Sequence, residues 1–172
     1  ACTGNIITQN QFNANSSYGI YMQFSSENSI ETNTVDGQNT SLHGIYLQNG
    51  SKNNTLAANT VRAATNNGIY FNDQTNGNVL RGNTSKLNAN HGVLFDFSSN
   101  NNTLIGNVLS ENTLNGVRLD ASSGNRFVSN TFDSNVLWQV FLTGSASSDT
   151  FEKNYFAPSP TNPDSALYNA ST

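Results

Sequence analysis

The stretch that decides the fold is NTLAANTV at residues 54–61, followed by GIYF at residues 68–71. The first segment recurs as NIITQNQF at residues 5–12 and NSIETNTV at residues 28–35, and its pattern starts again at residues 78, 102, 125 and 149. The second segment recurs as GIYM, GIYL, GVLF and GVRL from residues 19, 44, 92 and 116, and as QVFL, without the glycine, from residue 139. Self-similarity at a nearly fixed period indicates a repeat architecture.

Each segment has the alternation of apolar and variable residues that is typical of a short, half-buried strand. Stacked coils would place the apolar positions inside as columns. The expected columns are Ile7, Ile30, Leu56, Leu80, Leu104, Phe127 and Phe151; Phe12, Val35, Val61, Ser85, Leu109, Phe132 and Phe156; Ile20, Ile45, Ile69, Val93, Val117 and Val140; and Met22, Leu47, Phe71, Phe95, Leu119 and Leu142. We therefore predict an all-β, single-stranded right-handed parallel β-helix, a solenoid of about seven coils of about 24 residues each. It spans residues 1–156, and residues 157–172, which hold all three prolines, form a C-terminal cap or tail.

One asparagine occupies the same position in all seven repeats. Asparagine tolerates the left-handed backbone conformation of a sharp turn, and stacked asparagines can hydrogen-bond to their equivalents in neighbouring coils. We expect this structural ladder to comprise Asn10, Asn33, Asn59, Asn83, Asn107, Asn130 and Asn154. The recurring glycine is interpreted in the same way, as a turn residue.

The composition excludes several classes of function. Only 10% of the 172 residues are charged, the net charge is −4, and the seven lysines and arginines are scattered, so we expect no nucleic-acid partner. The sequence has no run of 18 apolar residues, which predicts no membrane span. The single cysteine, Cys2, has no partner for an intrachain disulfide.

The recurring form Asn-x-[Ile/Leu/Phe]-x-x-Asn-x-[Val/Phe], followed by [Asn/His]-Gly-[Ile/Val]-x-[Leu/Phe], resembles the parallel β-helix repeats of the NosD and polysaccharide lyase and epimerase group. The resemblance runs from Asn5 to about Phe156. The group includes pectin- and alginate-active enzymes, periplasmic accessory proteins, phage tailspikes and surface proteins. The resemblance therefore implies the fold more strongly than it implies an activity.

A narrow β-helix core leaves no room for a ligand, so we look for function on an outer face. The outward positions of the Gly-Ile-Tyr strands carry tyrosines and amides, which suit sugars because rings pack on apolar sugar faces and amides bond hydroxyls. The candidate carbohydrate-binding residues are Tyr21, Tyr46, Tyr70, Gln23, Gln48 and Asn72. Stacked cross-strand neighbours without a ligand are the competing interpretation. The glycine leaves open whether the preceding column faces outward; its members are Tyr18, His43, Asn67, His91, Asn115 and Gln139.

Two carboxylates follow on the next coils. Asp96 and Asp120 are 24 residues apart and should stack one coil apart. Like charges so close need relief, which either a calcium ion or the neighbouring Arg118 would give; calcium favours oxygen ligands of this kind. We expect no other cofactor.

The resemblance also raises a catalytic alternative. A uronate lyase or C5-epimerase needs a base and a group that neutralises the substrate carboxylate, and His91, Tyr70 and Arg118 are residues of the right types on neighbouring coils. Alginate epimerases carry Tyr-Gly-Phe-Asp-Pro-His on such a strand. Here the nearest match, Tyr18-Gly19-Ile20-Tyr21-Met22-Gln23, lacks the Asp and the His, which counts against this activity.

We therefore predict a secreted or cell-surface repeat domain without catalytic activity, which binds polysaccharide on a lateral face or serves as a structural and adhesive rod. A polysaccharide-active enzyme is the first alternative. The second is a filament subunit whose copies stack end to end, because the repeat begins within five residues of the first residue. The expected partner is polysaccharide or another copy of the chain.

Overall fold

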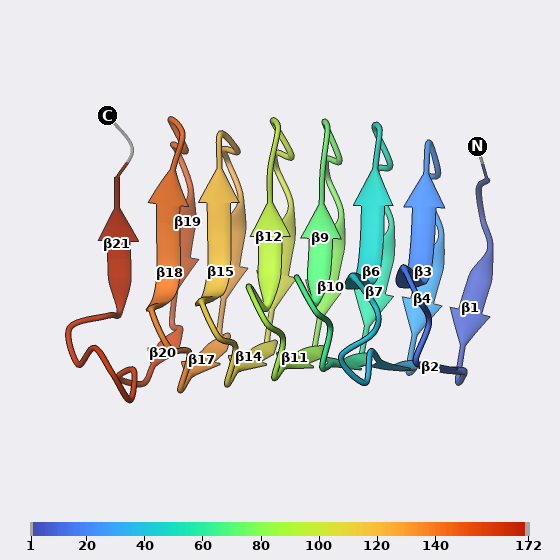
Figure 1. Cartoon of the computed structure of the whole chain (residues 1–172). Helices are drawn as coiled ribbons and strands as arrows, with labels where there is room; N and C mark the ends of the chain where they lie inside the picture. Colours follow the sequence, from blue (N-terminus) through green and yellow to red (C-terminus); the bar gives the residue numbers. More distant parts are fainter. Residues whose placement is uncertain (1, 171–172) are drawn as a thin grey trace.

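The computed structural model describes residues 2–170, and it confirms the predicted right-handed parallel β-helix of seven coils. Its strands stack along the axis of a rod (Figure 1). Three parallel sheets of seven strands form its sides. The predicted outer bounds at residues 1 and 172 lie outside the described residues. Within residues 2–170, no helix is long and apolar enough to cross a membrane.

The first two sheets are built from three-residue strands, with one two-residue strand at the end of the second sheet. The first sheet contains β1 (Ile6–Thr8), β4 (Ser29–Glu31), β7 (Thr55–Ala57), β10 (Val79–Arg81), β13 (Thr103–Ile105), β16 (Arg126–Val128) and β19 (Thr150–Glu152). The second contains β2 (Gln11–Asn13), β5 (Thr34–Asp36), β8 (Thr60–Arg62), β11 (Thr84–Lys86), β14 (Val108–Ser110), β17 (Thr131–Asp133) and β20 (Tyr155–Phe156).

The third sheet has longer strands in four of its coils and positions the candidate site. It contains β3 (Tyr18–Gln23), β6 (His43–Gln48), β9 (Ile69–Phe71), β12 (Val93–Phe95), β15 (Asn115–Asp120), β18 (Trp138–Thr143) and β21 (Leu167–Asn169). The tail beyond Phe156 supplies the last of these strands. Strand β21 pairs in parallel with β18, with Tyr168 beside Phe141.

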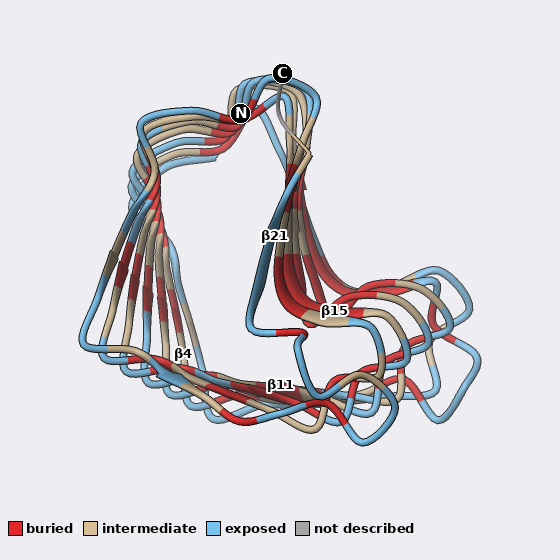
Figure 2. Cartoon of the chain, turned by 90° about the vertical axis from the view of Figure 1, so that its left-hand side faces the viewer, coloured by how far each residue is buried: buried red, intermediate tan, exposed pale blue. Residues whose placement is uncertain are grey.

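The core consists of the predicted apolar columns. Ile30 pairs in register with Leu56, and Ile45 pairs with Ile69, so each column continues from coil to coil. Viewed along the rod, buried segments recur at matching places in successive coils, and exposed segments lie mainly at the turns (Figure 2). Ser85 is the polar member of its column; its hydroxyl is buried and donates to the Gly92 carbonyl over 2.7 Å.

Asparagine ladders fix the corners of the coil. From Asn10 to Asn130, the backbone N–H and side-chain Nδ2 of each ladder asparagine donate to Oδ1 of its equivalent in the following coil, over 2.8–3.1 Å. A second ladder, not recognised from the sequence, joins the first asparagine of each repeat from Asn5 to Asn125 and ends at Asp149.

For two recurring residues, the ladder asparagine and the glycine, the sequence analysis gave the wrong physical reason for their recurrence. The ladder asparagines do not have a positive φ; the residue before each one does, with φ between 52° and 63°, as at Ala58 and Gly82. The recurring glycine is needed for space rather than for turning. A Cβ on Gly44 would lie 2.2 Å from Cγ1 of Val61 and 2.7 Å from the Gly68 carbonyl oxygen.

Candidate functional site

The lateral face of the third sheet holds almost all of the candidate site residues. We use "lateral face" for its outward side chains: Tyr21, Gln23, Tyr46, Gln48, Tyr70, Asn72, Leu94, Asp96, Arg118, Asp120, Phe141, Thr143 and Tyr168. The parallel register stacks one residue of each coil on its equivalent in the next, so chemistry changes stepwise along the rod. Tyrosines and amides come first, charged residues follow, and aromatic residues return at the end.

The tyrosines form a hydrogen-bonded row with the amides. The Tyr46 hydroxyl donates to Gln48 Oε1 and accepts from Asn72 Nδ2 over 3.0 Å, and Gln48 Nε2 donates to the Tyr21 hydroxyl. The Tyr70 hydroxyl donates to Asp96 over 3.2 Å. Burial raises the pKa of Tyr70 well above its ordinary value, and the nearby Asp96 raises it further, so its hydroxyl keeps its proton at neutral pH.

The predicted packing of sugars on ring faces does not match this geometry. The rings of Tyr46 and Tyr70 stack on each other, with centroids 4.9 Å apart and planes at 6°. Their faces are therefore used between coils, and Tyr46 is only 8% exposed. Tyr21, in the first coil, is 43% exposed. Along most of the row a ligand would meet hydroxyls, amides and ring edges rather than ring faces.

The column before the glycines, whose direction the sequence left open, is buried from His43 to Asn115, while Tyr18 at its start is half-buried. His43 and His91 are 5% and 4% exposed. The backbone N–H of Asn67 donates to His43 Nδ1 over 3.3 Å, and Asn115 Nδ2 donates to His91 Nδ1 over 3.2 Å. A neutral imidazole whose Nδ1 accepts carries its proton on Nε2.

This environment bears directly on the catalytic prediction for His91. Burial and, to a smaller extent, the Arg118 guanidinium lower its pKa to about 4, so the ring is neutral at pH 7. Its lone pair is already taken by Asn115. In this arrangement the ring presents a donor, whereas a general base needs a free acceptor.

The end of that column differs from the prediction. Trp138, and not Gln139, pairs with Asn115, because Gln139 stands at the glycine position. This register creates an aromatic cluster that the sequence analysis missed. The Tyr168 ring stacks on Trp138, with centroids 4.7 Å apart, and on Phe141, with centroids 5.3 Å apart. The signal in the sequence was a tyrosine in the tail, which joins the sheet through β21.

The charged residues lie between the two aromatic groups. Asp96 follows Phe95, which pairs with Leu119, so Asp96 and Asp120 are neighbours on adjacent coils, as predicted from their spacing. Arg118 forms an ion pair with Asp120, and its guanidinium lies 5.7 Å from the Phe141 ring centroid. Asp96 accepts from the Phe97 N–H over 2.8 Å. Burial raises the pKa of Asp96, and the Asp120 carboxylate raises it further.

Calcium at Asp96 and Asp120 stays a prediction. Within residues 2–170, no three His, Cys, Asp or Glu side chains are grouped so as to hold a metal ion. Asn72 Oδ1, in the same column, is a buried acceptor without a hydrogen-bond partner. Arg118 already relieves the charge of Asp120.

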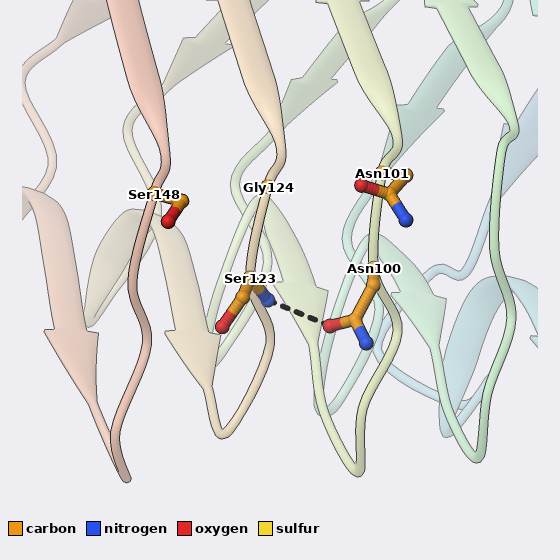
Figure 3. A pocket seen from close by; sticks show the side chains of 5 residues that line it. All are labelled: Asn100, Asn101, Ser123, Gly124 and Ser148. Carbon is orange, nitrogen blue, oxygen red and sulfur yellow. Dashed lines mark hydrogen bonds between the residues drawn. The ribbon is translucent and has the colours of Figure 1, made fainter.

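A shallow hollow lies at the corner between the third and first sheets, next to the lateral face. Its volume is about 240 Å³, and Figure 3 shows its lining of small polar residues from neighbouring coils: Asn100, Asn101, Ser123, Gly124 and Ser148. The Ser123 N–H donates to Asn100 Oδ1 over 2.7 Å. Gly124 leaves room for Asn101, whose Oδ1 would lie 2.5 Å from a Cβ there. These contacts serve the stacking of the turns.

Comparison by sequence finds one family. The family described as "Periplasmic copper-binding protein (NosD)" matches residues 1–78 and 41–166, which together span most of the chain. Among curated proteins, none matches the sequence.

Comparison by structure finds solenoids of the same kind. The periplasmic alginate epimerase AlgG superposes with a TM-score of 0.79 at 19% identity, over 99% of this chain and 46% of that one. The A-module of the Azotobacter vinelandii mannuronan C-5 epimerase AlgE4 gives a TM-score of 0.76 at 15% identity, over 98% of this chain and 53% of the module. The chain thus spans about half the length of these structures, and at such identities the likeness is one of fold.

The copper named in the family description does not fit the residues that the structure describes. Copper sites are built from clustered histidine, cysteine and methionine ligands. His43 and His91 stand two coils apart, and each Nδ1 accepts a hydrogen bond from an asparagine. Met22 is packed in the core, and Cys2 is exposed near the N-terminus. We derive no copper chemistry from these residues.

Proposed function

Because this chain belongs to the NosD family of β-helix repeat proteins, we propose that it is a polysaccharide-binding rod whose lateral face takes the ligand without chemical change. The likeness to alginate and mannuronan epimerases supports a polysaccharide-related role. The family description names a periplasmic protein, and AlgG is a periplasmic epimerase. We infer a location outside the cytoplasm, in the periplasm or beyond the cell surface.

The observation that carries this proposal is the row of hydrogen-bonding groups on the lateral face. Tyr21, Gln48, Tyr46 and Asn72 are linked side chain to side chain across three coils. Groups held in this way lose little conformational freedom when a ligand binds. Gln23 extends the row at the first coil, and Tyr70 extends it toward Asp96. A regular array of fixed hydroxyls and amides suits a polymer of sugar hydroxyls.

The test is binding to a panel of soluble polysaccharides, measured by isothermal titration calorimetry. The informative variant is Tyr21→Ala, because Tyr21 is 43% exposed on an edge strand and its loss leaves the core intact. The matched control is Tyr155→Ala, the same substitution on the second sheet, where the side chain is 62% exposed. We expect Tyr21→Ala alone to weaken binding. Equal effects of the two variants would contradict a site on this face.

The alternative function is a uronate epimerase or lyase that uses His91, Tyr70 and Arg118. The observation in its favour is the fold shared with mannuronan C-5 epimerases. Against it, the His91 lone pair is occupied and Arg118 is paired with Asp120. Incubation with polymannuronate decides the matter, with ultraviolet absorbance reporting new double bonds and proton NMR reporting the C5 configuration. Either signal, if lost in His91→Asn, would establish the enzyme and refute our proposal.

A structural rod or an end-to-end filament is the remaining alternative. Sedimentation velocity over a range of protein concentrations tests it, because association of copies raises the sedimentation coefficient with concentration. A protein that bound no polysaccharide and associated in this way would favour the filament over the binding module.

A further inference from the structure

The basic residues of the chain are placed unevenly among the three sheets. Six of the seven lie on the first two sheets or in the turns beside them, and Arg118 is the one on the third sheet. These six are Lys52, Arg62, Arg81, Lys86, Arg126 and Lys153. The third sheet and the turns that follow its strands carry five carboxylates, those of Glu27, Asp73, Asp96, Asp120 and Asp149, against the basic residues Lys52 and Arg118. The lateral face therefore has a negative balance of its own.

Arg118 does not make this face less negative toward a ligand, because its positive charge is already paired with Asp120. Its guanidinium forms an ion pair with Asp120 and lies over the Phe141 ring. A ligand carboxylate would have to compete with Asp120 for it. Asp96 accepts hydrogen bonds from neutral partners, the Tyr70 hydroxyl and the Phe97 N–H, and it has no ion pair of its own; Arg118, paired with Asp120, acts on it only from a distance.

The histidines beneath this face do not offset its negative charge. His43 and His91 lie beneath it and add no positive charge, because burial lowers the pKa of each to about 4. Two tyrosines respond to the carboxylates. Burial is the largest cause of the raised pKa of Tyr70 and of Tyr46. Asp96 and Asp120 raise the pKa of Tyr70 further, and Asp73 raises that of Tyr46 further. The carboxylates thus act on the tyrosine row as well as on their own column.

We propose that the lateral face takes an uncharged polysaccharide and rejects polyuronates. This inference rests on the proposed function and narrows its ligand. A polyuronate laid on this face would bring further carboxylates toward Asp96 and Asp73, and like charges at short range oppose binding unless they are relieved. A neutral glycan keeps every hydroxyl contact to the tyrosine and amide row without that cost.

The test compares two ligands that share a backbone and differ in charge: oligogalacturonides and their fully methyl-esterified forms. Affinities are measured by calorimetry at low salt, once with a chelator and once with calcium chloride. We expect the ester to bind about tenfold or more tightly than the acid in both conditions. The gap should narrow as salt is raised, because the Debye length shortens to about 8 Å at physiological ionic strength.

Two variants locate the effect. Asp96→Asn should raise the affinity for the acid relative to that for the ester, and so narrow the gap between the two ligands. Asp133→Asn makes the same change of net charge on the second sheet and should leave both unchanged. The proposal is overturned if the acid binds as tightly as the ester in chelator, if calcium makes the acid the better ligand, or if Asp133→Asn acts like Asp96→Asn. Binding of neither ligand, together with none from the wider panel, would refute the proposed function itself.

Discussion

Removing a single asparagine from the middle of the ladder should cost far more than removing its equivalent at the end. Asn83 Oδ1 accepts from the Asn59 N–H and from Asn59 Nδ2, each over 2.9 Å. Its Nδ2 donates to the Leu56 carbonyl over 2.8 Å and to Asn107 Oδ1 over 3.0 Å. Asn83→Ala deletes these four hydrogen bonds in a site that is 1% exposed.

The magnitude follows from what is left unpaired. A neutral hydrogen bond contributes about 0.5–1.5 kcal/mol net, and a buried group left without a partner costs about 1–3 kcal/mol. Loss of four bonds, with the Asn59 N–H orphaned, should lower the free energy of unfolding by about 4 kcal/mol. That is a large part of the roughly 5–15 kcal/mol typical of a folded domain.

Asn10→Ala is the matched control. Asn10 belongs to the same column, but it is exposed, and its side chain makes two hydrogen bonds, to the Thr8 carbonyl and to Asn33 Oδ1. Asn33 Oδ1 keeps the backbone N–H of residue 10 as a donor in the variant. We expect a loss of about 1 kcal/mol or less.

The assay is unfolding in guanidinium chloride, followed by circular dichroism of the strands. Because neighbouring coils stabilise one another in a solenoid, Asn83→Ala should also reduce the cooperativity of the transition, with a smaller slope. Equal losses in the two variants, or a loss below 1 kcal/mol for Asn83→Ala, would refute the reasoning.

Two further predictions concern pH. Burial raises the pKa of Asp149 to about 6, and its Oδ2 is buried without a partner where the other members of that ladder carry an amide nitrogen. The folded state therefore binds this proton more tightly than the unfolded chain, and the resulting stability, complete below about pH 4, is lost as the pH rises through 6. Asp149→Asn should stabilise the protein by about 1 kcal/mol at pH 7, a shift of two units being discounted for partial exposure, and by little at pH 4, as measured by denaturant unfolding at both values. For His43 and His91 the sign is opposite: burial lowers each pKa to about 4, so their contribution is complete above about pH 6.5 and is lost as the pH falls through 4. Asparagine occupies the alternate positions of the column before the glycines, so it fits there in place of histidine. The double variant His43→Asn with His91→Asn should lose less stability between pH 7 and pH 4, by about 2 kcal/mol per histidine. An unchanged dependence of the free energy of unfolding on pH would contradict the buried, neutral state of the two rings.

The fold was predictable because each coil repeats the same physical solution. Alternation with period two determines which side chains face inward, and a period near 24 brings Ile30, Leu56 and Leu80 into one column. The register of the structure is the one that the aligned repeats predict. No long-range information beyond the period was needed, because each strand pairs with its own equivalent one coil away.

The site was less predictable, because side-chain direction depends on features that the repeat does not encode. The glycine changes strand parity, so a reader of the sequence could not tell that His91 is buried and bonded to Asn115. Ring orientation was also hidden: the sequence places Tyr46 beside Tyr70 but does not say that they stack face to face. Tyr168 lay in a tail with no visible repeat, and it joins the sheet only through β21.

Departures from the repeat are the most informative positions in a protein of this kind. The inward positions Ile69, Val93 and Val117 stay apolar because they are fully buried in the core between stacked coils. The outward residues beside them are free of that demand, yet they change from Tyr70 to Leu94 and then to Arg118. Stacking alone would favour a continued tyrosine row, since each ring gains a partner above and below. The break in the row is therefore where the chain departs from what the fold requires. There Arg118 pairs with Asp120, and Asp96 and Asp120 stand in the column beside the row. This is the part of the face that the two ligands of different charge test directly.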